Sequence, residues 1–125
     1  MNKEHLDWNV YSNQCPTREV LARLADKWAL LILGRLESGP VRFNNLRRDV
    51  QGISQKVLTQ TLRKLERDGL LARQGFSTVP VTVEYSITPL GQTLTKTVSV
   101  LMHWAEKNMD AVLAAQAAYD AANVA

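Results

Sequence analysis

Apolar positions along this chain follow two spacings, and each spacing predicts a different kind of element. Between residues 16 and 67 apolar side chains recur every three to four positions, which is the period of a helix lying on a core. Between residues 71 and 87 they alternate with polar ones, as in a half-buried strand, and after residue 88 the helical spacing returns. The pattern predicts an α+β chain that is mostly α.

Turn and capping residues divide the first helical region. Pro16 suits the first position of a helix that runs to about residue 25, and Asp26 opens a second helix that is too apolar for the surface. A very short strand at 41–42 precedes a third helix, from Phe43 to about residue 50. The second helix is expected in the core through Trp28, Leu30, Leu31, Ile32, Leu33 and Leu36.

The stretch from Ser54 to Arg67 sorts into two opposed faces of a fourth helix. Its apolar face holds Leu58, Leu62 and Leu65, with Ser54 as the N-cap and Gly69 as a left-handed stop just after the end. The opposite face holds Lys56, Thr59, Gln60, Arg63 and Arg67. Because Gly52 forms a tight turn between the third and fourth helices, the pair is expected to be a helix-turn-helix.

Two strand-like runs follow this helix pair. Leu71–Phe76 and Val81–Ile87 are joined by a turn at 77–80, and a hairpin attached to a helix-turn-helix makes a winged helix with a two-stranded wing. The tip of this wing is short and uncharged, which leaves Arg73 and Thr78 as its expected phosphate contacts.

A long helix is expected from Pro89 to about residue 122, with Thr88 as its N-cap. At 1.5 Å per residue it would be about 50 Å long, more than a small domain can cover, so a partner chain is expected to pack on it as a homodimer. Its repeating positions are Leu90, Leu94, Val98, Leu101, Ala105, Met109, Val112 and Gln116. The 125 residues then form one domain, with an arm (1–15), a winged-helix core (16–87) and a dimerisation helix (88–122).

Composition and charge narrow the class of protein. With 46% hydrophobic and 22% charged residues, no apolar run of membrane-spanning length and no signal peptide, the chain is expected to be cytoplasmic. Eight basic and three acidic residues lie between positions 42 and 73, a net charge of +5, whereas the rest of the chain carries −2. Such a focused positive region favours a polyanion as the partner.

Few residues suggest chemistry of another kind. Cys15 is the single cysteine and only His5 and His103 accompany it, so neither a disulfide within the chain nor a zinc site is expected. Phosphate-binding glycine loops and catalytic triads are absent from the sequence. We therefore expect no cofactor, no metal and no enzymatic activity.

The polar face of the fourth helix carries groups that match double-stranded DNA. Gln60 can bond adenine through two hydrogen bonds, Arg63 can read guanine or hold a phosphate, and Lys56 is expected on a phosphate. Three residues at the start of the preceding helix are expected to anchor the DNA backbone, since helix N-termini favour phosphate. They are Arg42, Asn44 and Asn45.

With these elements in place, the chain resembles the HxlR-type transcriptional regulators, a winged-helix family related to the MarR regulators. The resemblance rests on LADKWALLILGRLESGPVRFNNLRRDV (24–50), GISQKVLTQTLRKLERDGLLAR (52–73) and VPVTVEYSITPLGQTL (79–94). It implies a homodimer that binds an operator and usually controls a nearby gene. The positions it implies as groove-facing are Ser54, Gln55, Lys56, Thr59, Gln60 and Arg63.

Cys15 is a candidate redox sensor. A thiol at a helix N-terminus with Arg18 one turn away is expected to have a lowered pKa and more thiolate. The resemblance adds that several family members carry, at this position, a cysteine that senses electrophiles, quinones or oxidants. Oxidation would end in a disulfide with a second protomer, a mixed thiol adduct or alkylation. The alternative is a small, packed and inert cysteine.

Two further functions stay open on the sequence. A winged helix can serve as a protein-interaction module whose basic face meets an acidic partner. A regulator of this fold can also sense a small aromatic ligand in a pocket beneath the dimer helices, lined by Trp8, Trp28, Met102 and Trp104.

Overall fold

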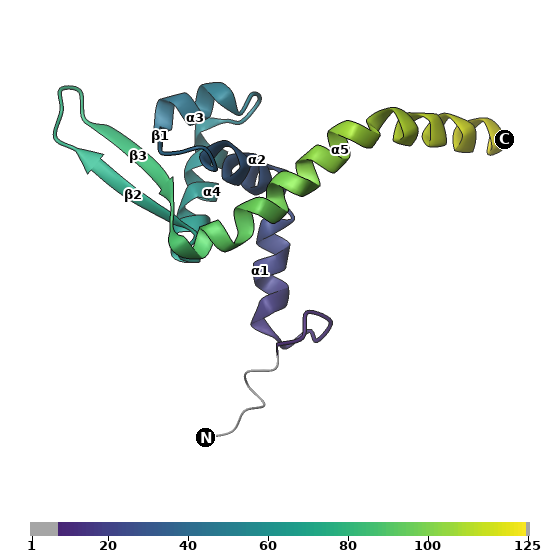
Figure 1. Ribbon diagram of the computed structural model, residues 1–125, viewed down its shortest axis with the longest axis horizontal. Coiled ribbons are helices and arrows are strands. Elements are labelled where there is room, and N and C mark those ends of the chain that lie inside the picture. Colours follow the sequence, from purple (N-terminus) through teal and green to yellow (C-terminus); the bar gives the residue numbers. More distant parts are fainter. Residues whose placement is uncertain (1–7, 125) are drawn as a thin grey trace, which may run out of the picture.

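The computed structural model describes residues 8–124, and its elements run α1-α2-β1-α3-α4-β2-β3-α5 (Figure 1). Helices α2, α3 and α4 gather with the base of the sheet into one body, from which α1, the hairpin and the far half of α5 project (Figure 1). Part of the expected arm, residues 1–7, lies outside the described residues. The mostly helical winged helix-turn-helix expected from the sequence is confirmed.

The two N-terminal helices differ sharply in burial. Helix α1 (Pro16–Leu24) has no buried residue, whereas α2 (Lys27–Leu36) buries Ala29, Ile32, Leu33 and Leu36. The expectation that all apolar residues of α2 lie in the core was wrong for Leu31, which is 37% exposed. A helix of this length turns one side away from the core, and Leu31 lies on that side.

The helix-turn-helix consists of α3 (Phe43–Asp49) and α4 (Gln55–Arg67). The apolar side of α4 is fully buried at Leu58 and Leu62, as its period predicted. Ser54 caps it, because its Oγ accepts a hydrogen bond from the backbone N–H of Val57 at 3.1 Å.

The sheet has three strands rather than the two of the hairpin alone. Strands β2 (Leu71–Phe76) and β3 (Thr82–Ile87) form the antiparallel wing, and β1 (Val41–Arg42) pairs with the base of β3 in the order β1-β3-β2. The register places Val41 opposite Tyr85 on β3. This pairing fixes the start of α3 against the wing, so the hairpin is joined to the helix-turn-helix at both of its strands.

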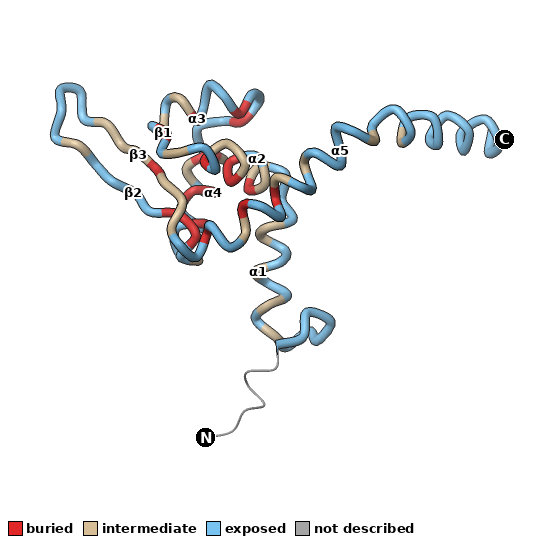
Figure 2. The backbone as a smooth tube through the Cα atoms, in the orientation of Figure 1, coloured by how far each residue is buried: buried red, intermediate tan, exposed pale blue. Residues whose placement is uncertain are grey.

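Helix α5 (Pro89–Ala122) starts at the expected cap, where the Oγ1 of Thr88 accepts from the N–H of Gly91 at 3.0 Å. Its N-terminal part packs on α2 and buries Val98, and beyond the body most of its residues are exposed (Figure 2). Exposed apolar side chains there include Leu101, Trp104, Met109 and Leu113. No helix of the described chain is long and apolar enough to cross a membrane.

Candidate nucleic-acid interface

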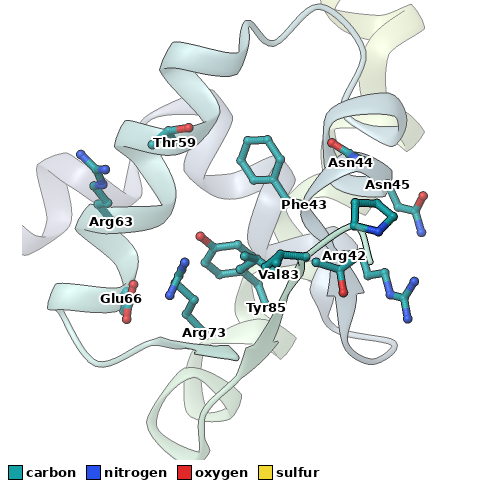
Figure 3. A pocket seen from close by; sticks show the side chains of 13 residues that line it. Arg42, Phe43, Asn44, Asn45, Thr59, Arg63, Glu66, Arg73, Val83 and Tyr85 are labelled. Atoms are coloured by element: carbon teal, nitrogen blue, oxygen red, sulfur yellow. The ribbon is translucent and has the colours of Figure 1, made fainter. Parts of the chain in front are cut away.

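A groove of about 680 Å³ lies between α4 and the wing (Figure 3). Helix α4 forms one wall through Thr59, Arg63 and Glu66, and the inner face of the hairpin forms the other. The start of α3 closes one end with Arg42, Asn44 and Asn45. Three segments that are distant in sequence therefore present their polar side chains to one open space.

The helical period explains which residues of α4 face the wing. Thr59, Arg63 and Glu66 are spaced by four and three positions, so they lie on one line along the helix. Lys56, Gln60 and Arg67 are also exposed but do not line the groove. The predicted polar face of α4 is therefore real, but it divides between a wing-facing line and an outward-facing one.

The wing contributes one cation through the sheet register. Arg73 pairs with Tyr85 across β2 and β3, and paired residues share a face, so the Arg73 guanidinium and the Tyr85 ring both turn into the groove (Figure 3). Thr78, expected as a second phosphate contact, donates its hydroxyl proton to the carbonyl oxygen of Pro80 at 2.7 Å. Its side chain is thus already bonded inside the wing loop.

Charge in the groove is predominantly positive. Three guanidinium groups and one carboxylate line it. Within residues 8–124, Arg42, Arg63 and Arg73 form no ion pair with a carboxylate. Guanidinium groups without a protein counter-charge, held in a concave surface, are suited to bind phosphate oxygens.

The structure brings six of the predicted interface residues together and leaves the others outside the groove. Those that line it are Arg42, Asn44, Asn45, Thr59, Arg63 and Arg73; those outside it are Ser54, Gln55, Lys56, Gln60, Arg67 and Thr78. Sequence reasoning missed Glu66, which the spacing from Arg63 could have placed. It also missed the apolar floor of Phe43, Val83 and Tyr85, because that floor depends on how β3 packs beside α3.

Cys15 lies far from this groove, at the N-terminus of α1. Its half-buried thiol is 2.9 Å from Oγ1 of Thr17 and accepts from the backbone N–H of Asn9 at 3.3 Å. The hydrogen bond with the Thr17 side chain lowers the pKa of Cys15, burial opposes it, and backbone hydrogen bonds add to the lowering. The expected direction of the pKa is confirmed, but its cause is Thr17 rather than Arg18, because local hydrogen bonds stabilise the thiolate directly.

A second, wholly apolar groove of about 350 Å³ lies on the side of α1. Trp8 and Val10 of the arm and Leu21 and Leu24 of α1 are among the residues that line it. The other candidate ligand-pocket residues lie elsewhere: Trp28 and Met102 pack on the core, and Trp104 is 57% exposed. Within one described chain the expected aromatic pocket does not form, since these side chains face different surfaces.

The chain matches known regulators over most of its length. The profile of the HxlR-like helix-turn-helix family matches residues 23–112. The HTH-type transcriptional regulator YtfH of Escherichia coli strain K12 is 43% identical over 114 residues, which cover 91% of this chain and 90% of that protein.

Solved structures agree with this match. The transcriptional regulator ytfH from Salmonella typhimurium has a TM-score of 0.84 at 44% identity and covers 88% of this chain and 98% of its own. The redox regulator HypR in its oxidized form has a TM-score of 0.69 at 38% identity and covers 75% of this chain and 97% of its own.

Proposed function

This chain belongs to the HxlR-like helix-turn-helix family of transcriptional regulators, and from that premise we propose that it binds a specific operator in double-stranded DNA as a homodimer. The observation that carries the proposal is the groove between α4 and the wing, whose three guanidinium groups form no ion pair within residues 8–124. A phosphate backbone supplies the missing negative charge, and the outward line of α4 supplies donors and acceptors for base edges.

The proposed roles divide along the two lines of α4. Lys56 and Gln60 of the outward line, together with Gln55 at the first position of the helix, would enter the major groove, where recognition helices contact bases mainly through their N-terminal residues. Arg63 and Arg73 would hold phosphate from opposite walls, and Arg42 with its neighbouring asparagines would bind the backbone at the start of α3. Ser54 contributes indirectly, because its side chain already accepts the capping hydrogen bond.

Fluorescence anisotropy tests the proposal on two labelled duplexes, the DNA upstream of the chain's own gene and a scrambled duplex of the same composition. We expect binding that is selective for the upstream DNA. A plot of the logarithm of the binding constant against the logarithm of the salt concentration should have a slope of about −0.9 for each phosphate contact. The double variant Lys56→Ala/Arg63→Ala should lose affinity and show a shallower slope. A matched variant on α5, Lys96→Ala/Lys107→Ala, removes the same charge from exposed positions outside the groove and should bind as the wild type does.

Two results would count against this assignment. Unchanged duplex binding by Lys56→Ala/Arg63→Ala would show that α4 does not form the DNA interface. Binding without any preference for flanking DNA would instead favour a protein-interaction module, whose basic groove meets an acidic partner.

The exposed apolar stripe of α5 supports the homodimer. This helix of about 50 Å leaves Leu101, Trp104 and Met109 exposed, and the described residues of its own chain do not cover them. The same helix in a second copy would present a matching stripe, since twofold interfaces pair a surface with itself. Two recognition helices could then address half-sites about 34 Å apart.

Cys15 is the proposed sensor of oxidants or electrophiles. Its lowered pKa and partial exposure favour the reactive thiolate, and the similar structures include a redox regulator. Diamide would join the Cys15 thiols of two protomers in a disulfide, its N=N bond taking up both hydrogens. Operator affinity should then fall in the anisotropy experiment, and Cys15→Ser should abolish the response; an unchanged response in that variant would exclude Cys15 and point to a ligand-responsive regulator.

A further inference from the structure

The short segment where α4 ends and the wing begins, residues 68–70, is bonded to two distant helices. Arg23 of α1 donates from Nε to Oδ2 of Asp68 at 2.7 Å and from Nη2 to Oδ1 at 2.8 Å. Thr88, at the start of α5, donates from Oγ1 to the carbonyl oxygen of Gly69 at 2.6 Å, and its N–H donates to that of Leu70 at 3.1 Å. We call residues 68–70 the junction.

Asp68 is an unusual residue for this position. It is the C-cap of α4, where the helix dipole places partial negative charge, and Glu66 is close in sequence. Only 12% of the Asp68 side chain is exposed, so water does little to screen the repulsion between its carboxylate and these negative charges. Arg23 supplies the counter-charge through two parallel hydrogen bonds from a residue 45 positions earlier. The carboxylate stands where a helix C-terminus disfavours negative charge, and a tertiary contact stabilises it there. This combination indicates that Asp68 has a role beyond α4 itself.

The rest of α1 is held weakly. None of its residues is buried, and Leu24 packs only partly against the core. Among the described ion pairs, Arg23–Asp68 is the one that joins α1 to the helix-turn-helix. The orientation of α1 relative to α4 therefore depends strongly on this pair.

The junction also connects the two walls of the groove. Arg63 and Glu66 precede it on α4, and Arg73 follows it on β2. A small rotation at Asp68 would change the separation between these walls, because one wall lies on each side of the segment. Cys15 lies eight residues before Arg23, about 12 Å along the helix.

We propose that Arg23 and Asp68 are positioning residues that couple the orientation of α1 to the junction, and through it to the spacing between α4 and the wing. This inference rests on the proposed function in placing a sensor at the far end of α1. A modification at Cys15 would tilt α1, and the two parallel hydrogen bonds would transmit the tilt to the groove.

Hydrogen exchange of the full-length protein tests the coupling without DNA. Exchange is measured by mass spectrometry on peptides spanning residues 66–73, before and after iodoacetamide alkylates Cys15. We expect alkylation to change exchange there several-fold in the wild type and not in Asp68→Asn. The reversed pair Arg23→Glu/Asp68→Arg should restore the change, because it rebuilds the contact with opposite charges. Asp49→Asn removes a carboxylate that accepts from Arg35 at 2.9 Å and should respond like the wild type.

The coupling is overturned if alkylation leaves the wild-type junction unchanged, or changes it equally in Asp68→Asn. Thermal unfolding shows whether Asp68→Asn is folded. If it is not, Arg23→Lys is used instead, because it keeps the positive charge without the two parallel hydrogen bonds, and alkylation should then change exchange at the junction less than in the wild type. Operator affinity after diamide is measured separately. If redox regulation holds, we expect the operator affinities before and after diamide to differ by roughly 5- to 150-fold. A wild type in which alkylation changes exchange at the junction but diamide leaves operator affinity unchanged would refute redox regulation. The coupling between α1 and the junction would still stand.

Discussion

At the scale of single residues, the environment of Cys15 depends on a neighbour two positions away. The Thr17 hydroxyl lies 2.9 Å from the sulfur and stabilises the thiolate by hydrogen bonding. Replacing Thr17 with Val, which has the same shape without the hydroxyl, should raise the pKa of Cys15. Alkylation by iodoacetamide near pH 7 should slow several-fold, with the midpoint of its pH profile shifted upward.

Thr17→Ser is the matched control for that prediction, since it keeps the hydroxyl and should retain the wild-type profile. Identical pH profiles for the Val and Ser variants would show that Thr17 does not set the pKa.

Sequence reasoning located Cys15 but not the reason for its pKa. A helix N-terminus and a nearby arginine are visible in the order of residues, whereas the side-chain rotamers that bring Thr17 to the sulfur are not. Arg23 and Asp68 show the same limit over a longer distance, because nothing local pairs two residues 45 positions apart. Contacts of this kind follow from packing and become visible only in the structure.

At the scale of elements, the boundaries were predictable because local signals set them. Ser54 and Thr88 cap α4 and α5 as expected, and Gly52 and Gly69 adopt the positive φ angles of 92° and 80° that their turn and stop positions require. The pairing of β1 with β3 was not predictable from periodicity, since a two-residue strand has no pattern of its own. The α4 wall of the groove was therefore predictable from the sequence. Its floor was not, because the floor depends on how the strands pair.

Helix α5 begins in close contact with the sheet, and Gly91 makes this possible. A methyl group at Gly91 would meet the carbonyl oxygen of Leu70 and lie 2.8 Å from Cγ2 of Ile87. Gly91→Ala should therefore lower the free energy of unfolding by about 1–3 kcal/mol, because backbone must move to admit the side chain. Urea unfolding followed by circular dichroism measures the change.

Gly34→Ala is the matched control for Gly91→Ala in another helix. A methyl group at Gly34 would meet only the far end of the flexible Met102 side chain, which can shift. Its cost should be clearly smaller, and the gain in helix propensity of up to about 1 kcal/mol offsets part of it. Equal losses in both variants would contradict the close approach at Gly91.

At the scale of the whole molecule, the body contains one core, and α1, the hairpin and the far half of α5 project from it (Figure 2). The described residues leave the far half of α5 uncovered. Leu101→Glu should weaken the proposed dimer by at least roughly 100-fold, because a twofold interface loses about 1.5–3 kcal/mol of burial at each of two copies. A sedimentation-velocity concentration series measures the dissociation constant.

His103→Glu introduces the same carboxylate two positions later, about 200° around the helix, and should leave the dimer intact. A wild type that stays monomeric across the micromolar range would refute the homodimer. A dimer that dissociates equally in both variants would place the interface on another face of α5.

The strand order β1-β3-β2 leaves β2 at the outside of the sheet, with a row of backbone N–H and C=O groups that no other strand in the described part of the chain satisfies. Such an edge is a template on which strands from other molecules can add, and the addition can continue without limit. In β2 the stretch Arg73, Gln74 and Gly75 carries a charge and a poor strand former where a run of branched apolar residues would invite that growth. Arg73, for which we propose a phosphate contact, therefore also interrupts this edge, and changes made there to sharpen DNA binding should be checked first for solubility.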